Sequence, residues 1–191
     1  DQDNYPEMLS NNINCIKVAS NENVWFGSDY GLNKLIYENS ESTVVQYTNA
    51  DGLISNQVRS IDEDPDGGIW IGTTQGVSYY DGINWVSFSS PDLPFGGVSA
   101  TSFDLNGDKW FASPLGGVTR FDGDNFTTYN ETNGLISKYV RDILIDLDGN
   151  KWIGTDKGMT MLDNSNSLFT HFTRMYIMPP PDTLNPVVDI S

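Results

Sequence analysis

A fourfold internal repeat constrains the fold of this chain more than any other feature of its sequence. Four short segments each contain a Trp followed by an apolar residue and then Gly or Ala: Trp25, Trp70, Trp110 and Trp152. The four tryptophans are spaced 45, 40 and 42 residues apart. Repeats of this length are typical of β-propeller blades and of helical solenoids, so the secondary structure within one unit decides between the two.

The second repeat divides into four short strands separated by turn residues. Its expected strands are 57–64, 69–73, 76–81 and 84–88, and the breaks between them contain Asp, Gly and Pro. The third and fourth repeats divide in the same way, and helical periodicity of useful length is absent from all of them. Four antiparallel strands per repeat predict an all-β fold, namely a β-propeller of four visible four-stranded antiparallel blades.

The repeat boundaries predict six segments along the chain. They are an inter-blade connection and N-terminal arm (1–10), blade 1 (11–55), blade 2 (56–96), blade 3 (97–137), blade 4 (138–173) and a Pro-rich C-terminal tail or linker (174–191). Three arrangements are open: a closed four-bladed propeller, a ring paired with a second copy, or part of a larger propeller. We favour closure or pairing, because an uncovered blade face would expose a large apolar surface.

The innermost strand of a blade lies between neighbouring blades. We therefore expect this strand to be apolar on both faces, as the "DILI" stretch of the fourth repeat is.

The charge and the scarcity of two residue types exclude several functions. The formal charge of −16, from 26 acidic and 10 basic residues, repels nucleic acids and anionic membrane surfaces. Cys15 and His171 are the only residues of their kinds, which removes disulfides and most zinc, haem and catalytic-triad arrangements. We expect no cofactor, a small buried role for Cys15, and a surface or packing role for His171.

No run of 18 apolar residues occurs, so membrane insertion is not expected. The first ten residues lack the basic and apolar regions of a signal peptide, which predicts a chain that is either cytosolic or already processed. The acidic, Asn-, Gly- and aromatic-rich composition favours a bacterial periplasmic or surface protein.

Acidic turns precede three of the four repeat tryptophans and superficially resemble calcium loops. The residues are Asp64 and Asp66, Asp104, Asn106 and Asp108, and Asp146, Asp148 and Asn150. The distal Glu of a calcium loop is missing, and the first repeat has no Asp in this turn. Asx side chains cap turns by accepting bonds from nearby backbone amides, and Gly permits positive φ. We therefore predict hairpin turns without metal.

The repeat tryptophans occupy one fixed place in each blade. Aromatic rings often bind sugars, but this placement within a strand predicts inter-blade core residues for Trp25, Trp70, Trp110 and Trp152. Trp85 lies outside the repeat pattern, in an outer strand, and is expected to be more exposed.

Ligands of propellers usually contact the loops at one end of the central channel, which a rigid ring holds while they vary. The connections between blades and the turns between second and third strands share that end in the usual blade topology. The repeats differ there, which predicts the following ligand-binding residues: Asn14, Asp29, Tyr30, Arg59, Gln75, Arg141, Asp156 and Lys157.

Arg59 and Arg141 each stand eleven residues before their repeat Trp. Two arginines near a channel mouth, in a chain with 10 basic residues, predict contact with a polar or anionic ligand. Ordinary ion pairs with Asp62 or Asp142 are the alternative.

Residues 47–77, "YTNADGLISNQVRSIDEDPDGGIWIGTTQGV", resemble the two-component regulator propeller repeat over their whole length. The resemblance extends over roughly residues 9–173. The third repeat departs most, with Ala112 in place of Gly and one residue inserted before Gly117. The resemblance implies a sensory context, often related to glycans, as in periplasmic sensor regions of hybrid two-component systems and related surface proteins.

Three functions follow as hypotheses. The first is a non-catalytic ligand-recognition or protein-interaction module, periplasmic or extracellular, whose partner is a glycan, a small polar ligand or a protein. The second is a propeller-type lyase or glycoside hydrolase. A hydrolase needs two carboxylates about 5–9.5 Å apart, and Asp29 and Asp156 are the acids at corresponding loop positions. The third is a structural or assembly module, with a homodimer among its arrangements.

Overall fold

The computed structural model describes residues 8–38, 41–94 and 96–174. The first seven residues of the predicted N-terminal arm, and the Pro-rich tail from residue 175 on, lie outside the described residues. The described chain forms sixteen strands in four antiparallel four-stranded sheets, which confirms the all-β prediction.

Each sheet is one blade, and its four strands pair in chain order. Blade 1 contains β1 (Ile13–Val18), β2 (Val24–Ser28), β3 (Leu32–Glu38) and β4 (Glu41–Tyr47). Blade 2 contains β5 (Val58–Glu63), β6 (Ile69–Thr73), β7 (Gly76–Tyr80) and β8 (Trp85–Phe88). Blade 3 contains β9 (Ala100–Phe103), β10 (Lys109–Ser113), β11 (Gly117–Phe121) and β12 (Phe126–Tyr129). Blade 4 contains β13 (Val140–Ile145), β14 (Lys151–Thr155), β15 (Gly158–Leu162) and β16 (Phe169–Phe172).

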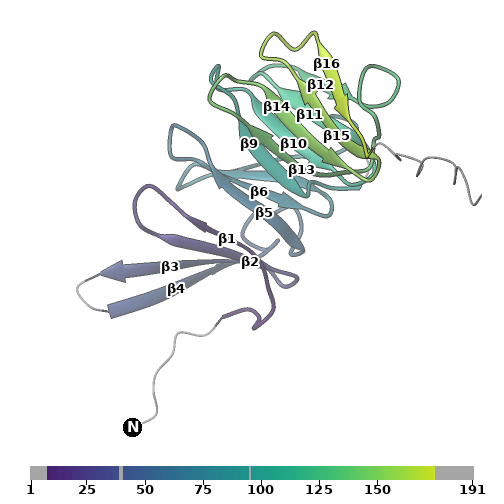
Figure 1. Ribbon diagram of the computed structural model, residues 1–191. Coiled ribbons are helices and arrows are strands. Elements are labelled where there is room, and N and C mark those ends of the chain that lie inside the picture. The colour runs from purple at the N-terminus through teal and green to yellow at the C-terminus, as the bar shows by residue number, and fades with distance from the viewer. Residues whose placement is uncertain (1–7, 39–40, 95, 175–191) are drawn as a thin grey trace, which may run out of the picture.

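The four blades form an open arc (Figure 1). Their inner strands pack in the order β1 to β5, β5 to β9 and β9 to β13, and blades 1 and 4 lie at the two ends. The closed four-bladed propeller, which was one of the expected arrangements, is therefore not the arrangement of this structure.

Aromatic contacts between outer strands explain why the arc does not close. Rings of neighbouring outer strands touch directly, with centroids 5.5 Å apart for Tyr47 and Trp85 and 5.4 Å apart for Phe88 and Phe126. In a ring of four, adjacent sheets diverge by about a right angle, which would separate their outer strands beyond ring contact. The nearly face-to-face packing seen here turns the chain too little per blade for closure after four.

Trp85 is part of this packing, contrary to the expected exposed position. Its ring stacks on Tyr80 with centroids 4.6 Å apart and contacts Tyr47 of blade 1. The register of the outer strands places Trp85 at the boundary between blades 1 and 2, where it is half-buried.

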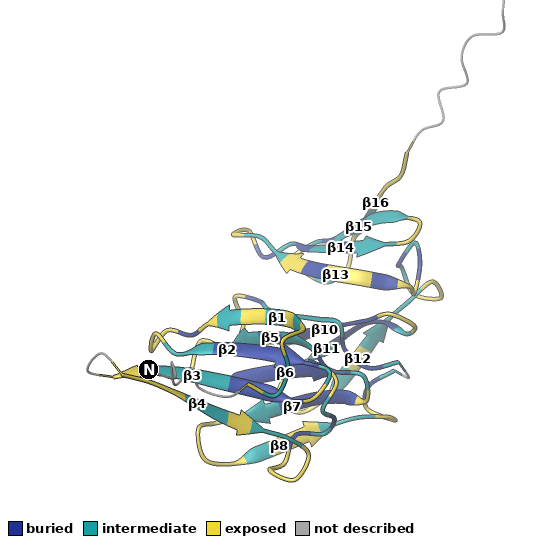
Figure 2. Ribbon diagram, turned by 90° about the horizontal axis from the view of Figure 1, so that it is seen from below, coloured by how far each residue is buried: buried dark blue, intermediate teal, exposed yellow. Residues whose placement is uncertain are grey.

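In blades 1 to 3 burial is greatest in the second strand, not in the innermost strand. All five residues of β6 are buried, whereas in β13 only Val140 and Ile143 are buried, and Leu144 is 61% exposed. Figure 2 shows the dark blue of buried residues on β2 and β6. The prediction of an inner strand that is apolar on both faces is therefore wrong, because β5 reads VRSIDE. β5, which has a blade on each side, has no exposed residue, whereas the exposed Leu144 of β13 belongs to blade 4, at the end of the arc.

A carboxylate six residues before the repeat Trp binds the first hairpin of a blade to its core. In blade 2, Asp64 Oδ1 accepts the backbone N–H groups of Asp66 (3.1 Å) and Gly68 (2.8 Å). Its Oδ2 accepts the indole Nε1–H of Trp70 at 2.9 Å. Asp64 is buried, so one side chain satisfies three donors, two of them in the turn.

The same arrangement recurs in blades 3 and 4. Asp104 accepts Trp110 Nε1–H at 3.1 Å, and Asp146 accepts Trp152 Nε1–H at 2.8 Å. Both also accept two backbone amides of their turns. The predicted Asx-capped turns are thus confirmed, and the bond to the Trp is an additional finding.

Blade 1 lacks this arrangement. Ala19 stands where the other blades have Asp, and the buried Trp25 Nε1 has no hydrogen-bond partner within the described residues. Three residues before the Trp, Glu22 has a φ of 66°, where Gly67 has 86°. A side chain in this left-handed region is strained. The sequence of the first hairpin therefore stabilises its turn less than the sequences of the other three hairpins do.

Replacing Asp64 tests how much the carboxylate contributes. Asp64→Ala leaves buried amide and indole donors without an acceptor and should lower the free energy of unfolding by about 2–5 kcal/mol. Asp66→Ala, an exposed residue of the same turn, is the matched control and should change it by less than about 0.5 kcal/mol. Urea unfolding measures both, and equal effects of the two variants would contradict the assignment.

Candidate functional site

The second turns and the starts of the inner strands meet at one end of the blades, here called the upper end. Thr74 N–H donates to Gln57 O, and Asp156 N–H donates to Tyr139 O. These backbone bonds join the turn between second and third strands to the connection that leads into its own blade. The predicted ligand-binding residues accordingly share the upper end.

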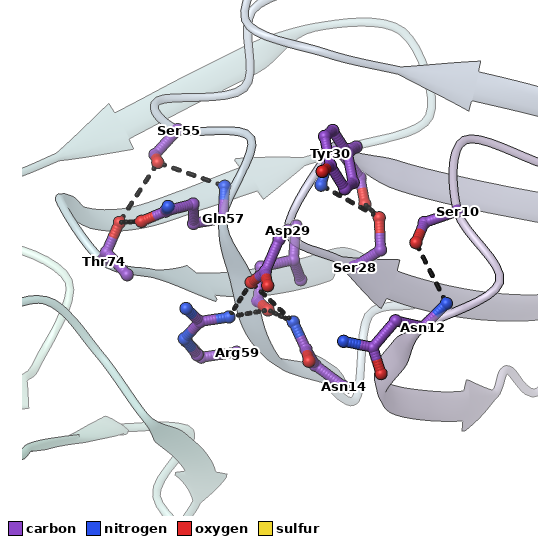
Figure 3. A network of polar contacts seen from close by, with 12 residues as sticks. Ser10, Asn12, Asn14, Ser28, Asp29, Tyr30, Ser55, Gln57, Arg59 and Thr74 are labelled. Carbon is purple, nitrogen blue, oxygen red and sulfur yellow. Dashed lines mark hydrogen bonds and ion pairs between the residues drawn. The ribbon is translucent and has the colours of Figure 1, made fainter.

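Three of these residues form one polar group between blades 1 and 2 (Figure 3). Arg59 donates to Asp29 Oδ1 at 2.5 Å, and Asn14 donates to the same oxygen at 3.1 Å. Asn14 also donates to the Val58 carbonyl at 3.0 Å. The Arg59 guanidinium, followed by the Asn14 amide, holds the pKa of Asp29 below its ordinary value. The group is therefore a charge-neutralised contact between blades.

The ion pair considered between Arg59 and Asp62 is not formed. Asp62 pairs with Lys17 of blade 1. Arg59 lies at an irregularity in the pairing of β5 with β6, between Val58 and Ser60, and its guanidinium contacts Asp29 of blade 1 instead.

A second group lies between blades 3 and 4, around Arg141. Pro114, Tyr139, Val140, Arg141 and Asp156 line a shallow depression of about 330 Å³. The exposed Arg141 side chain makes no hydrogen bond or ion pair with the described part of the chain, and Asp142 does not pair with it either.

A single difference between repeats explains why Arg141 is unpaired. The partner of Arg59 is Asp29, which stands four residues after its repeat Trp on the preceding blade. On the blade that precedes Arg141, the residue four positions after the Trp is Pro114. Proline offers no acceptor side chain, so Arg141 keeps its hydrogen-bonding capacity for another group.

The surroundings of Arg141 carry charges of both signs. Lys138 Nζ lies 5.5 Å from the centroid of the Tyr139 ring, which is 42% exposed. The pKa of Glu131 is lowered, first by the Lys138 backbone N–H and further by the charges of Lys138 and Lys157. The upper end of blade 4 therefore carries the cations Lys138, Arg141 and Lys157 together with the acidic Glu131 and Asp156.

Gln75, Tyr30 and Lys157 are not among the residues that form the Arg59 group or line the Arg141 depression. Gln75 lines a depression of about 390 Å³ with Thr74, Ser89, Ser90, Pro94, Gly96 and Gly97. Tyr30 is 65% exposed, and Lys157 is exposed with its backbone N–H bound to Thr155 Oγ1. The upper end thus carries three features. At Arg59 the charges of the polar group are paired, at Arg141 the guanidinium is unpaired among the described residues, and at Gln75 there is an uncharged depression.

Tyr139 is the residue of the Arg141 depression that the sequence reasoning missed. It lies in the connection between blades, two positions before Arg141, where an aromatic residue interrupts a polar stretch. That interruption of a polar connection by a single aromatic residue is the sequence signal for this position.

The two acids required by the hydrolase hypothesis belong to different groups. Asp29 lies on blade 1 and is bonded to Arg59, whereas Asp156 lies on blade 4 beside Arg141. A general acid needs a raised pKa, and the pKa of Asp29 is lowered. Cys15 is likewise a poor nucleophile, because burial raises its pKa to about 11.

Within residues 8–38, 41–94 and 96–174, no three His, Cys, Asp or Glu side chains are grouped closely enough to hold a metal ion. The described chain also contains no helix of the length and apolarity needed to span a membrane.

Comparison with known proteins agrees with the repeat pattern. Residues 52–75 match the family model described as two component regulator propeller. The resemblance seen in the sequence is thereby confirmed for this repeat. No curated protein sequence matches the chain.

Solved structures with the same fold include an extracellular domain of a two component system, a lyase and a component of a secretion system. The first is the extracellular domain of a protein described as a hybrid two component system from B. thetaiotaomicron, with a TM-score of 0.76 and 22% identity over 87% of this chain and 24% of that chain. The second is virginiamycin B lyase from Staphylococcus aureus, with a TM-score of 0.68 and 17% identity over 88% of this chain and 59% of that chain. The third is PorZ, a surface component of the type-IX secretion system of Porphyromonas gingivalis, with a TM-score of 0.63 and 19% identity over 84% of this chain and 27% of that chain.

These likenesses show the fold. The chain spans about a quarter of the length of the B. thetaiotaomicron domain, and its four sheets correspond to blades of a propeller. The same fold serves an enzyme and a sensor domain, so the function has to be argued from the site.

The Arg59 ion pair predicts a pH-dependent contribution to stability. A carboxyl with a lowered pKa in the folded state stabilises the fold above its ordinary value of 3.8, and this contribution is lost as pH falls through the folded value. Arg59→Ala should therefore lower stability slightly at neutral pH and have no effect well below pH 3.8.

Urea unfolding at the two pH values measures the difference. Arg141→Ala is the matched control and should have no pH-dependent effect, because Arg141 has no carboxylate partner. An Arg59→Ala effect of the same size at both pH values would contradict the ion-pair account.

Proposed function

We propose that this chain is part of an extracytoplasmic sensor-type propeller that recognises an anionic ligand at the upper end of blade 4. The observation that carries the proposal is the unpaired Arg141 guanidinium beside the exposed ring of Tyr139. Arg59 at the equivalent position is neutralised, whereas Arg141 can bind a carboxylate with two parallel hydrogen bonds.

The residues around Arg141 favour an acidic saccharide over other anions. A sugar ring can stack on Tyr139, its hydroxyl groups can donate to Asp156, and its carboxylate can pair with Arg141. Lys138 and Lys157 add positive charge next to this depression. A polyphosphate would be repelled by Asp156 and by the overall charge of −16, so a single carboxylate per sugar fits better.

The sensory part of the proposal is supported by the two component regulator propeller match and by the fold shared with an extracellular domain described as part of a hybrid two component system. The alternative of a lyase is supported by the fold shared with virginiamycin B lyase. The upper end favours binding over catalysis, because its acids are separated between two groups and Asp29 is ion-paired.

Isothermal titration with oligosaccharides of galacturonate tests the proposal. The chain should bind them, should bind neutral galactose oligosaccharides more weakly, and should lose affinity as salt is raised. Arg141→Ala should weaken binding by at least about tenfold, because it removes a charge-assisted bond.

Arg59→Ala is the matched control and should retain binding, since Arg59 already has a partner. Equal binding of charged and neutral oligosaccharides, or wild-type affinity of Arg141→Ala, would contradict the anionic site. Absence of binding to every acidic saccharide tested would overturn the ligand class.

A further inference from the structure

We propose that the open face of blade 4 binds a further blade of the same repeat type, one that carries a Lys immediately before its repeat Trp and an Arg eleven residues before it. The proposal rests on how the described blades contact one another. Each contact joins fixed repeat positions, so the chemistry of a blade that would fit this face can be deduced from the residues that blade 4 presents.

The first contact lies at the end of the blades that carries the acidic turns. Lys151 of blade 4 stands immediately before its Trp and lies 3.5 Å from Asp104 Oδ2 of blade 3, with both side chains fully buried. Lys151 Nζ also lies 5.0 Å from the centroid of the Trp110 ring and is bound to Asn166 Oδ1 at 2.7 Å. The turn carboxylate of one blade is thus compensated by a Lys of the next blade.

The same two positions lie near each other at the other boundaries. Between blades 2 and 3, Lys109 and Asp64 line one depression. Between blades 1 and 2, Ile69 and Ala19 belong to one apolar cluster. The turn carboxylates of blades 2 and 3 therefore each have a Lys at the position immediately before the Trp of the next blade. Ala19, which replaces the carboxylate in blade 1, has Ile69 at that position of blade 2.

The second contact lies at the upper end. Arg59 of blade 2 pairs with Asp29 of blade 1. These residues stand eleven positions before and four positions after their respective repeat tryptophans.

Blade 4 presents both acidic positions without a following blade. Asp146 stands six positions before Trp152, and Asp156 stands four positions after it. Asp64 and Asp104, the counterparts of Asp146, are only 8% and 5% exposed because the next blade covers them. Figure 2 shows blade 4 at the end of the stack with no described strand beyond it.

An apolar surface lies between the two acids. Trp152 is half-buried, and its ring contacts that of Phe172, which is 43% exposed. Leu144, which is 61% exposed, occupies the repeat position from which Lys17 reaches across to blade 2. The face thus has an apolar centre with a carboxylate at each end, which fits an apolar blade with a cation at each end.

Blade 1 of a second copy does not fit this face. It carries Val24 immediately before its Trp and Asn14 eleven residues before it. Docking it would cover Asp146 with an apolar side chain, and a buried carboxylate without a cation is strongly unfavourable. Blade 4 itself carries Lys151 and Arg141 at these positions, so a blade of its type is the complementary partner.

A five-blade chain tests the proposal, built by inserting a second copy of residues 130–173 after Thr173 of the full chain. The added blade should dock, which hydrogen exchange would show as protected amides in its strands. Lys151→Val in the added copy alone should shift the docking equilibrium toward the open state by roughly tenfold or more.

Asp146→Asn in the original blade 4 should reduce the effect of that Lys151→Val change to a few-fold, because the two positions then no longer form an ion pair. This cycle separates pairing from the general cost of each substitution. Lys157→Val in the added copy is a matched control on an exposed Lys and should leave docking unchanged.

Three results would overturn the proposal. The added blade could remain unprotected while blades 1–4 are folded, or its Lys151→Val form could dock as firmly as the parent. Sedimentation of the unmodified chain could also show a dimer that Trp152→Ser abolishes, in which case the occupant of this face would be a second copy. A monomeric chain whose added blade docks through Lys151 would support the proposal.

Discussion

The rest of the structure depends on a carboxylate held against an indole. Asp64, Asp104 and Asp146 each accept the Nε1–H of the Trp six residues later and two backbone amides of the turn between them. This arrangement fixes the first hairpin and sets the orientation of the Trp ring. It also places a negative charge at the boundary with the next blade, which must supply a compensating group. Ala19 in blade 1 shows the consequence of its loss, because Trp25 Nε1 is left buried without a partner among the described residues.

Fixed contact positions between blades also explain how a repetitive fold can carry a local site. A propeller repeats its apolar packing at every boundary, so function has to come from positions where the repeats differ. Asp29 closes one boundary by pairing with Arg59, and Pro114 leaves the next equivalent Arg141 free beside Tyr139. If a further blade neutralises Asp156 through its own Arg, Arg141 becomes still better suited to an anion.

The strands were predictable because the chain presents the same pattern four times. The expected strand 69–73 coincides with β6, and the expected 57–64 encloses β5. Closure was not predictable, because it depends on the angle that Tyr47, Trp85 and their counterparts impose between outer strands. For the candidate site, sequence differences indicated the upper end of the blades, where the structure places both arginines. The partner of Arg59 lies 30 residues away on another blade, so it became visible only in the packed structure.

A double-mutant cycle between Asp104 and Lys151 tests most directly whether the turn carboxylate also joins neighbouring blades. Asp104→Asn and Lys151→Met would each be measured by urea unfolding, alone and together. The account predicts that the double variant loses less stability than the sum of the single variants, with a coupling of roughly 1–3 kcal/mol, because either single change leaves a buried charge unpaired. Additive losses within about 0.5 kcal/mol would show that the two charges do not interact and would contradict the account.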